Sequence, residues 1–139
     1  MDPITAIGFA SNIIQFVDFG IKIVTGTLEV VKSGSLVENS NIAMIINDFH
    51  AVVQPLSRHP LGTSAHELAL KGLATGCQKV SQKLIELLET LRTSPNGSTW
   101  KSARVTVRSM RKKGEVASLE SQLDKYRSEV MTRLLLILT

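Results

Sequence analysis

The sequence predicts an all-α protein built as an antiparallel four-helix bundle, with a long hydrophobic helix at its N-terminus and a short extra helix at about residues 100–113. Apolar residues recur every three or four positions in four long segments, which is the spacing of one helix face. Short connections rich in Ser, Gly and Pro join these segments. The chain has 139 residues, of which 43% are hydrophobic, so residues 1–139 are expected to form one domain around a single core.

The first helix is expected to run from about residue 3 to residue 32 without a break. Gly20 and Gly26 lie inside this segment, but the three-and-four spacing continues across both glycines. No charged residue occurs at positions 3–17. Two apolar rows cover about two-thirds of the circumference, and one polar row covers the rest. The apolar rows are Ile7, Ala10, Ile14, Val17, Ile21, Val24, Leu28, Val31 and Phe9, Ile13, Phe16, Ile23, Val30, and the polar row is Ser11, Gln15, Asp18, Lys22, Thr25, Glu29, Lys32.

A helix with this pattern suits three settings: the interior of a bundle, a membrane, or each of these at a different time. The structural interpretation is that it forms the central core helix. The functional interpretation starts from the polar row, which carries no charge before Asp18. If several copies associated in a membrane, Ser11, Gln15 and Asp18 would line a shared lumen, and the single acid would favour cations.

Two capping boxes predict where the second and third helices begin. Ser35-x-x-Glu38 predicts the start of the second helix, which frays near residues 55–60. Ser64-x-x-Glu67 predicts the start of the third helix, which ends before a loop at residues 93–98. The apolar residues of the third helix follow heptad spacing. They are Leu70, Leu73, Cys77, Val80, Leu84, Leu87 and Leu91.

Residues 99–113 form an amphipathic segment, followed by Gly114 and a last helix. Residues 104–108 also alternate as a strand would, but only over this short stretch, so a helix is the better prediction. The apolar stripe of the segment is Trp100, Ala103, Val107 and Met110, and the last helix carries Val116, Leu119, Leu123, Tyr126, Val130, Leu134 and Ile137 at helical spacing.

Positive charge is concentrated beside that apolar stripe, although the net charge of the chain is only +4. A local positive patch predicts an anionic partner, and each basic residue near an anionic lipid surface contributes about 1 kcal/mol. We therefore predict contact with anionic membrane lipids, with Trp100 at the interface. The alternative is a solvated face with Trp100 in the core. A nucleic-acid partner is not expected, because aromatic interleaving and a recognisable motif are missing. The predicted lipid contacts are Lys101, Arg104, Arg108, Arg111, Lys112 and Lys113.

The residue types that usually act in catalysis or bind metals do not occur at the spacing of a known catalytic or metal-binding motif. His50, His59 and His66 share no ligand spacing, and the single Cys77 cannot form an internal disulfide. Phosphate-binding loops and nucleophile motifs are also missing. We therefore expect no enzymatic activity, no metal and no cofactor. The N-terminus lacks the basic region of a signal peptide, so the resting protein is expected in the cytoplasm.

The opening of the chain resembles the fungal HeLo-like domain, which is also described as the fungal N-terminal domain of STAND proteins, NOD-like receptors with a NACHT module. The most specific motifs are Met-Asp-Pro at 1–3, Ala-Ile-Gly at 6–8, Gln-Phe-Val-Asp-Phe-Gly at 15–20 and Lys-Ser-Gly at 32–34. Looser matches are Cys-Gln-Lys-Val at 77–80, Leu-Leu-Glu-Thr-Leu at 87–91, Trp-Lys-Ser at 100–102 and Leu-Asp-Lys-Tyr-Arg at 123–127. After Trp-Lys-Ser the family commonly has a bulky-aromatic segment, where this chain has Ala-Arg-Val-Thr-Val-Arg.

The resemblance implies a bundle related to the HeLo cell-death domain and to the four-helix executioner domain of the mixed-lineage-kinase-like pseudokinase. Such domains usually precede a receptor or an amyloid-signalling effector. On activation they oligomerise, reach the plasma membrane and permeabilise it through the first helix. In this chain the inserting residues would be Ile4, Ile7, Phe9, Ile13, Ile14, Phe16, Val17, Phe19 and Ile21.

The leading hypothesis is therefore a membrane-targeting cell-death execution domain in fungal innate immunity or heterokaryon incompatibility. Its expected partners are anionic lipids, further copies of itself, and a C-terminal NACHT, STAND or amyloid-signalling region or a partner receptor. The alternative is a non-toxic oligomerisation or adaptor module of a NOD-like receptor, without membrane activity.

Overall fold

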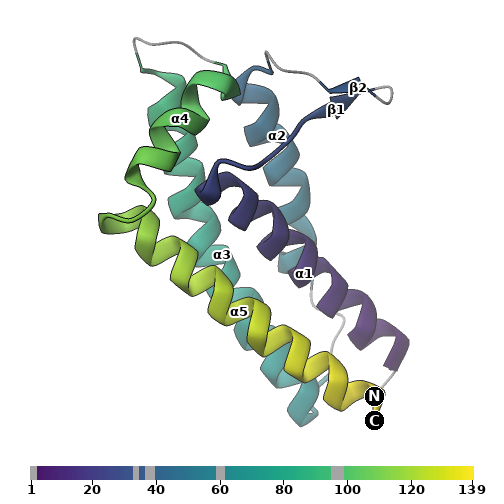
Figure 1. The fold of residues 1–139 in the computed structure, drawn as a ribbon. Coiled ribbons are helices and arrows are strands. Elements are labelled where there is room, and N and C mark those ends of the chain that lie inside the picture. Colours follow the sequence, from purple (N-terminus) through teal and green to yellow (C-terminus); the bar gives the residue numbers. More distant parts are fainter. Residues whose placement is uncertain (1–2, 33–34, 37–39, 59–61, 95–98) are drawn as a thin grey trace.

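The protein folds as a bundle of helices, as the sequence predicts (Figure 1). The structure is a computed structural model and describes residues 3–32, 35–36, 40–58, 62–94 and 99–139. Four longer helices form the bundle, and a shorter fifth helix, α4, crosses one of its ends. The helices are α1 (Pro3–Thr25), α2 (Ile42–Val53), α3 (Ala65–Arg92), α4 (Trp100–Met110) and α5 (Gly114–Leu138), with a 3-10 turn, η1 (Gln54–Ser57), after α2.

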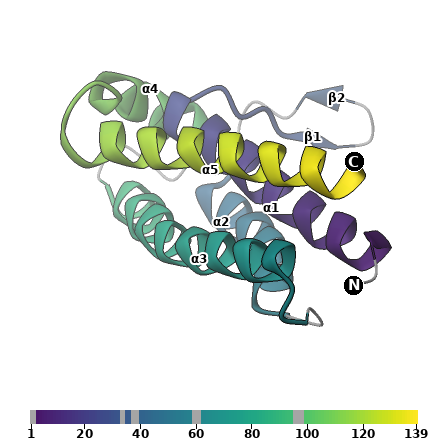
Figure 2. The ribbon, with the colours of Figure 1, turned by 90° about the horizontal axis from the view of Figure 1, so that it is seen from below.

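Helix α1 occupies the centre of the bundle. It contacts α2, α3, α4 and α5, and Figure 2 shows it between α5 on one side and α2 and α3 on the other. Its aromatic rings help to form the core, because Phe16 and Phe19 each lie with their ring centroids 5.5 Å from that of Phe49 in α2. Such tilted aromatic pairs add to the stabilisation that apolar burial provides.

The end of α1 differs from the prediction, because the helix stops at Thr25 instead of continuing to residue 32. Gly26 adopts a φ of +68°, which glycine reaches at little cost. The amide of Gly26 donates to the carbonyl of Ile23 at 3.1 Å, and the amide of Thr27 donates to that of Lys22 at 2.9 Å. This is the Schellman pattern of a helix C-terminus. The apolar spacing continues past Gly26, but the backbone turns away there.

The start of α2 also differs from the prediction. Ser35 lies in a two-residue strand, β2 (Ser35–Leu36), which pairs with β1 (Val31–Lys32) so that Ser35 is opposite Lys32. Glu38, the other half of the predicted capping box, lies outside the described residues. The helix begins later, at Ile42, where the side chain of Asn41 accepts a hydrogen bond of 2.8 Å from the amide of Ala43. Asn41 is therefore the N-cap of this helix and satisfies one of its free amides.

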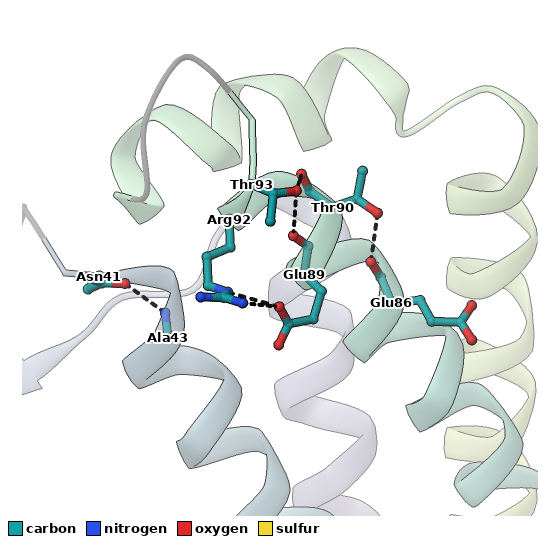
Figure 3. Close-up of polar contacts among 7 residues, drawn as sticks. All are labelled: Asn41, Ala43, Glu86, Glu89, Thr90, Arg92 and Thr93. Atoms are coloured by element: carbon teal, nitrogen blue, oxygen red, sulfur yellow. Dashed lines mark hydrogen bonds and ion pairs between the residues drawn. The ribbon is translucent and has the colours of Figure 1, made fainter.

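Helix α3 begins and ends where the sequence predicts. The Ser64 hydroxyl accepts from the amide of Glu67 at 3.3 Å, which confirms the second capping box. At the other end, Arg92 pairs with Glu89, and the Thr93 hydroxyl donates to the Glu89 carbonyl at 3.2 Å (Figure 3). The heptad prediction fails at one position only, because Leu88 is fully buried and Leu87 is half-buried. A regular α-helix drifts relative to a seven-residue repeat, which accounts for this shift by one residue.

Candidate functional site

The face of α1 predicted to enter a membrane is the face that builds the core. Phe9, Ile13, Phe16 and Val17 are all buried to 4% exposure or less. Four more of the predicted residues are only half-buried, whereas Ile4 at the start of the helix is 80% exposed. The half-buried residues are Ile7, Ile14, Phe19 and Ile21. In this folded state α1 is therefore a bundle helix, as the structural interpretation of its pattern proposes.

The polar row of α1 faces outwards along the seam with α5. Ser11 and Gln15 are exposed, and Asp18 is half-exposed. The Asp18 carboxylate pairs with Lys22 at 3.1 Å and with Arg127 of α5 at 3.8 Å. Asp18 and Gln15 also border a groove of about 350 Å³ between α1 and α5, whose apolar lining includes Ile14, Val17 and Met131. The three polar residues thus share one accessible strip in the monomer.

Helix α1 is long enough to cross a bilayer. Its 23 residues span about 35 Å, and the hydrocarbon core of a bilayer is about 30 Å thick. It has a mean hydropathy of 1.4 over its best 18-residue window and is the only helix with this property among the residues that the structure describes. Only 39% of that window is buried. The core helix of a soluble protein passes the same length and composition test. The length and composition of α1 therefore show that it could span a bilayer and do not show that it does.

The basic residues of the 101–113 segment divide into two groups. Arg108 and Arg111 are engaged within the fold: Arg108 donates from Nη2 to the carbonyl of Gly26 at 2.9 Å, and Arg111 donates to both carboxylate oxygens of Glu120 at 2.7 and 3.0 Å. The bidentate pair raises the pKa of Arg111 and, through the same hydrogen bond, lowers the pKa of Glu120. The side chains of the other four residues make no hydrogen bond or ion pair within the described parts of the chain; Lys101, Lys112 and Lys113 are exposed, and Arg104 is half-buried.

Trp100 lies in the core and not at the surface. Its side chain is 4% exposed, and its indole Nε1 donates to the carbonyl of Leu28 at 2.9 Å. Its backbone amide donates to the carbonyl of Ser40 at 2.8 Å, which ties the start of α4 to the residues that lead into α2. The prediction of an interfacial Trp100 is therefore wrong for the folded protein, and the alternative of a core Trp100 is confirmed.

The basic segment and the start of α1 lie at opposite ends of the bundle. Helix α4 contacts the residues that follow α1 through Gly26 and Leu28, whereas the first turn of α1 and the last turn of α5 lie at the other end of the bundle (Figure 1). A negatively charged surface that binds α4 would thus meet the last turn of α1 first. The sequence alone does not reveal this placement, because it depends on how α4 folds back across the bundle.

The residues considered for metal or thiol chemistry are dispersed. Among the described residues no group of three His, Cys, Asp or Glu side chains is placed to hold a metal ion. His50 is exposed, His66 lies 3.0 Å from a guanidinium nitrogen of Arg133, and His59 lies outside the described residues. Cys77 is fully buried, and burial raises the pKa of its thiol to about 12. Its side chain therefore acts as a small apolar core residue.

One family model matches this chain. The model of SesA, described as an N-terminal domain on NACHT NTPases and P-loop NTPases, matches residues 10–130. No match was found among curated proteins or among solved structures. The matched segment runs from the first half of α1 to the middle of α5 and includes all of α2, α3 and α4. The resemblance noted in the sequence is thereby confirmed at the level of an N-terminal domain of NACHT proteins. The chain belongs to the SesA family, the N-terminal domains of NACHT and other P-loop NTPases.

Proposed function

We propose that this SesA domain is a membrane-targeting execution module that oligomerises on activation and permeabilises membranes through α1. The observation that carries the proposal is the dual character of α1. The helix has no charge from residue 3 to residue 17, is long enough to span hydrocarbon, and yet packs against α2, α3, α4 and α5 in the bundle. A helix that served only as a core element would have no need of an uncharged outer row.

The energetics require a trigger for release of α1. Moving each large apolar side chain from the core into water costs about 1.5–3 kcal/mol, and α1 contributes Phe9, Ile13, Phe16, Val17 and Ile23 to the core. Transfer of these side chains into a bilayer recovers most of the free energy that is lost when they leave the core, whereas transfer into water does not. Release is therefore unfavourable in solution and becomes feasible at a membrane, with clustering by a neighbouring NACHT region or partner receptor supplying the remainder.

Anionic lipids are the proposed membrane partner, and the resting protein is proposed to be cytoplasmic and to move to the plasma membrane on activation. Lys101, Lys112 and Lys113 are exposed on one segment, and each contributes about 1 kcal/mol at an anionic surface. In the assembled state Ser11, Gln15 and Asp18 would face a common lumen. A relationship to the HeLo and mixed-lineage-kinase-like cell-death domains, and a role in fungal innate immunity, belong to the same proposal.

The experiment that tests the proposal compares two double variants in a vesicle leakage assay. Lys112→Glu with Lys113→Glu reverses two exposed charges in the basic segment, whereas Lys79→Glu with Lys83→Glu reverses two exposed charges on α3. We expect the first variant to lose co-sedimentation and leakage with phosphatidylserine vesicles and the second to retain more of both. Deleting residues 1–20 is unsuitable as a test, because α1 contributes Phe9, Ile13 and Phe16 to the core.

Vesicles that stay intact at every protein concentration, for the wild-type protein as for the variants, would contradict the proposal. That result would favour the adaptor alternative, in which the domain only oligomerises or docks a partner.

A further inference from the structure

Two side chains of α4 hold the segment that follows α1. The indole Nε1 of Trp100 donates to the carbonyl of Leu28 at 2.9 Å, and Nη2 of Arg108 donates to the carbonyl of Gly26 at 2.9 Å. The two donors stand two helical turns apart on α4, and the two acceptors stand two residues apart beyond the end of α1. Trp100 and Leu28 are both buried, so the first bond is shielded from water and costly to leave unmade.

Helix α4 also packs directly on the backbone of Gly26. A Cβ at this position would lie 2.8 Å from Cγ of Arg108, which is too close for a real side chain, and 3.0 Å from the carbonyl oxygen of Arg104, which is a tight contact. The φ of +68° further restricts the position to glycine. The last turn of α1 therefore ends under α4, with its turning residue covered by Arg108.

Other contacts anchor α4 itself without involving α1. Its first amide donates to the carbonyl of Ser40 before α2, and Arg111 beyond its last turn makes the bidentate pair with Glu120 of α5. Helix α4 is thus fixed at one end to the residues that precede α2 and at the other end to α5. The bonds from Trp100 and Arg108 can open without releasing α4 from the bundle.

We propose that α4 is a latch that keeps the end of α1 in the bundle, and that an anionic lipid surface opens it by drawing Arg108 away from the carbonyl of Gly26. The second half of this inference rests on the proposed function. The physical reason is that a guanidinium binds a phosphate more strongly than it binds a neutral carbonyl. Lys101 and Lys112 on the same segment would bring the surface close to Arg108. The latch is the physical link between the basic segment and α1, whose N-terminus lies at the far end of the bundle.

The latch itself is tested in solution by hydrogen exchange. The amides of Thr27 and Leu28 both donate to the carbonyl of Lys22, so their exchange reports on the end of α1. Arg108→Gln and Arg104→Gln each remove one charge from the same helix, but only Arg108 bonds to Gly26. We expect Arg108→Gln to speed exchange at these amides about fivefold or more, with little change for Arg104→Gln. Equal exchange in the two variants would overturn the latch.

A pair of glycine variants tests the packing on Gly26 independently. Gly26→Ala and Gly114→Ala both place alanine at a positive φ, but a Cβ at Gly114 meets nothing within 4 Å. The chain has a single tryptophan, so its fluorescence reports on Trp100 alone. We expect Gly26→Ala to shift the emission to longer wavelength and to increase its quenching by acrylamide. Unchanged emission in Gly26→Ala, or the same change in Gly114→Ala, would count against a latch at this position.

The role of the lipid surface is tested on the wild-type protein in three arms. Exchange at Thr27 and Leu28 is measured with phosphatidylserine vesicles, with phosphatidylcholine vesicles and with inorganic phosphate. We expect faster exchange in the first arm only. Faster exchange with inorganic phosphate would show that a free anion suffices and would overturn opening by a surface. Binding to phosphatidylserine vesicles without any change in exchange would overturn opening by lipid and leave the latch in solution standing.

The leakage assay separates this inference from the proposed function. At equal amounts of bound protein, we expect Arg108→Gln to leak vesicles faster than Arg104→Gln, because its latch is already weakened. If neither variant nor the wild-type protein causes leakage while the exchange difference persists, the proposed function fails and the latch remains. If all three leak at the same rate, the latch does not limit the release of α1.

Discussion

The ring of Tyr126 in α5 rests on the backbone of Gly76 in α3, where a Cβ would collide with the phenol oxygen and lie 2.8 Å from Cζ. This contact sets how closely α3 and α5 approach, and burial at the seam raises the pKa of the Tyr126 hydroxyl. A groove of about 510 Å³ borders the contact and is lined by Gly72, Leu73 and Thr132 among others. The two glycines of α3 therefore differ in their surroundings although they stand one turn apart.

We expect Gly76→Ala to destabilise the protein and Gly72→Ala to leave it unchanged or stabilise it. Overpacking of this kind costs about 1–3 kcal/mol, whereas alanine at an open helical position gains up to about 1 kcal/mol over glycine. A Cβ at Gly72 meets nothing within 4 Å. Urea unfolding of the two variants checks this, and equal stability of both would contradict the close packing at Tyr126.

Stability in acid should depend on Glu67 at the start of α3. Its carboxylate accepts from the Ser64 hydroxyl at 2.6 Å and from the amide of Gly62, and these hydrogen bonds lower the pKa of Glu67. A lowered pKa in the folded state contributes stability above the unfolded pKa, and this stability is lost as the pH falls through the folded value. We expect Glu67→Gln to be less stable than the wild-type protein at pH 7, with a smaller difference at pH 3. Urea titrations at both pH values measure the difference in the free energy of unfolding between the two proteins. The same difference at pH 7 and pH 3 would show that the Glu67 carboxylate does not have a lowered pKa in the folded state.

Cys77 should be inert in the folded protein. Its side chain is fully buried, and a pKa of about 12 leaves almost no thiolate at neutral pH. We expect a thiol reagent at pH 8 to label the native protein only as fast as the protein unfolds, and to label it at once in denaturant. Native labelling at the rate of a small free thiol would show that the α3 core opens readily.

Asp18 should influence ion selectivity more than folding. Its ion pairs with Lys22 and Arg127 are about half-exposed, so their loss costs only about 0–1 kcal/mol. If Asp18 lines a lumen, Asp18→Asn will lower the preference for cations in planar bilayers. The control is Asp124→Asn, which removes an exposed acid from α5. Reversal potentials that stay the same in Asp18→Asn would place this residue outside the conducting path.

The helices could be predicted from local sequence, but two of their ends could not. Ser64 and Ser35 both begin the pattern Ser-x-x-Glu, yet only Ser64 caps a helix. The backbone of Ser35 instead pairs opposite Lys32 in a two-stranded ribbon, and Asn41 takes the capping role. At Gly26 the apolar spacing continues, but the backbone conformation ends the helix. The spacing of apolar residues indicates which face of a helix a residue would occupy. It does not indicate that the same residues can instead form a strand, or that another residue caps the helix.

The candidate site was predicted in its parts but not in its arrangement. Residue type and spacing identified α1 and the basic segment. They did not reveal that Trp100 and Arg108 bind the residues after α1, because these partners are 72 and 82 positions apart in the chain. Such a contact depends on the path of the chain through α2 and α3. A tryptophan on the apolar stripe and an arginine two turns later were the only local signals.

The position of α1 during leakage tests the central claim most directly. An environment-sensitive dye is attached at Ile4→Cys, which is 80% exposed at the start of α1, and in a control at Gln82→Cys on the exposed face of α3. Labelling under native conditions avoids the buried Cys77. With phosphatidylserine vesicles carrying a quencher in their acyl chains, we predict that the Ile4 label shifts to shorter wavelength and is quenched as the vesicles leak, while the Gln82 label stays in water. Leakage with the Ile4 label still in water would contradict insertion of α1.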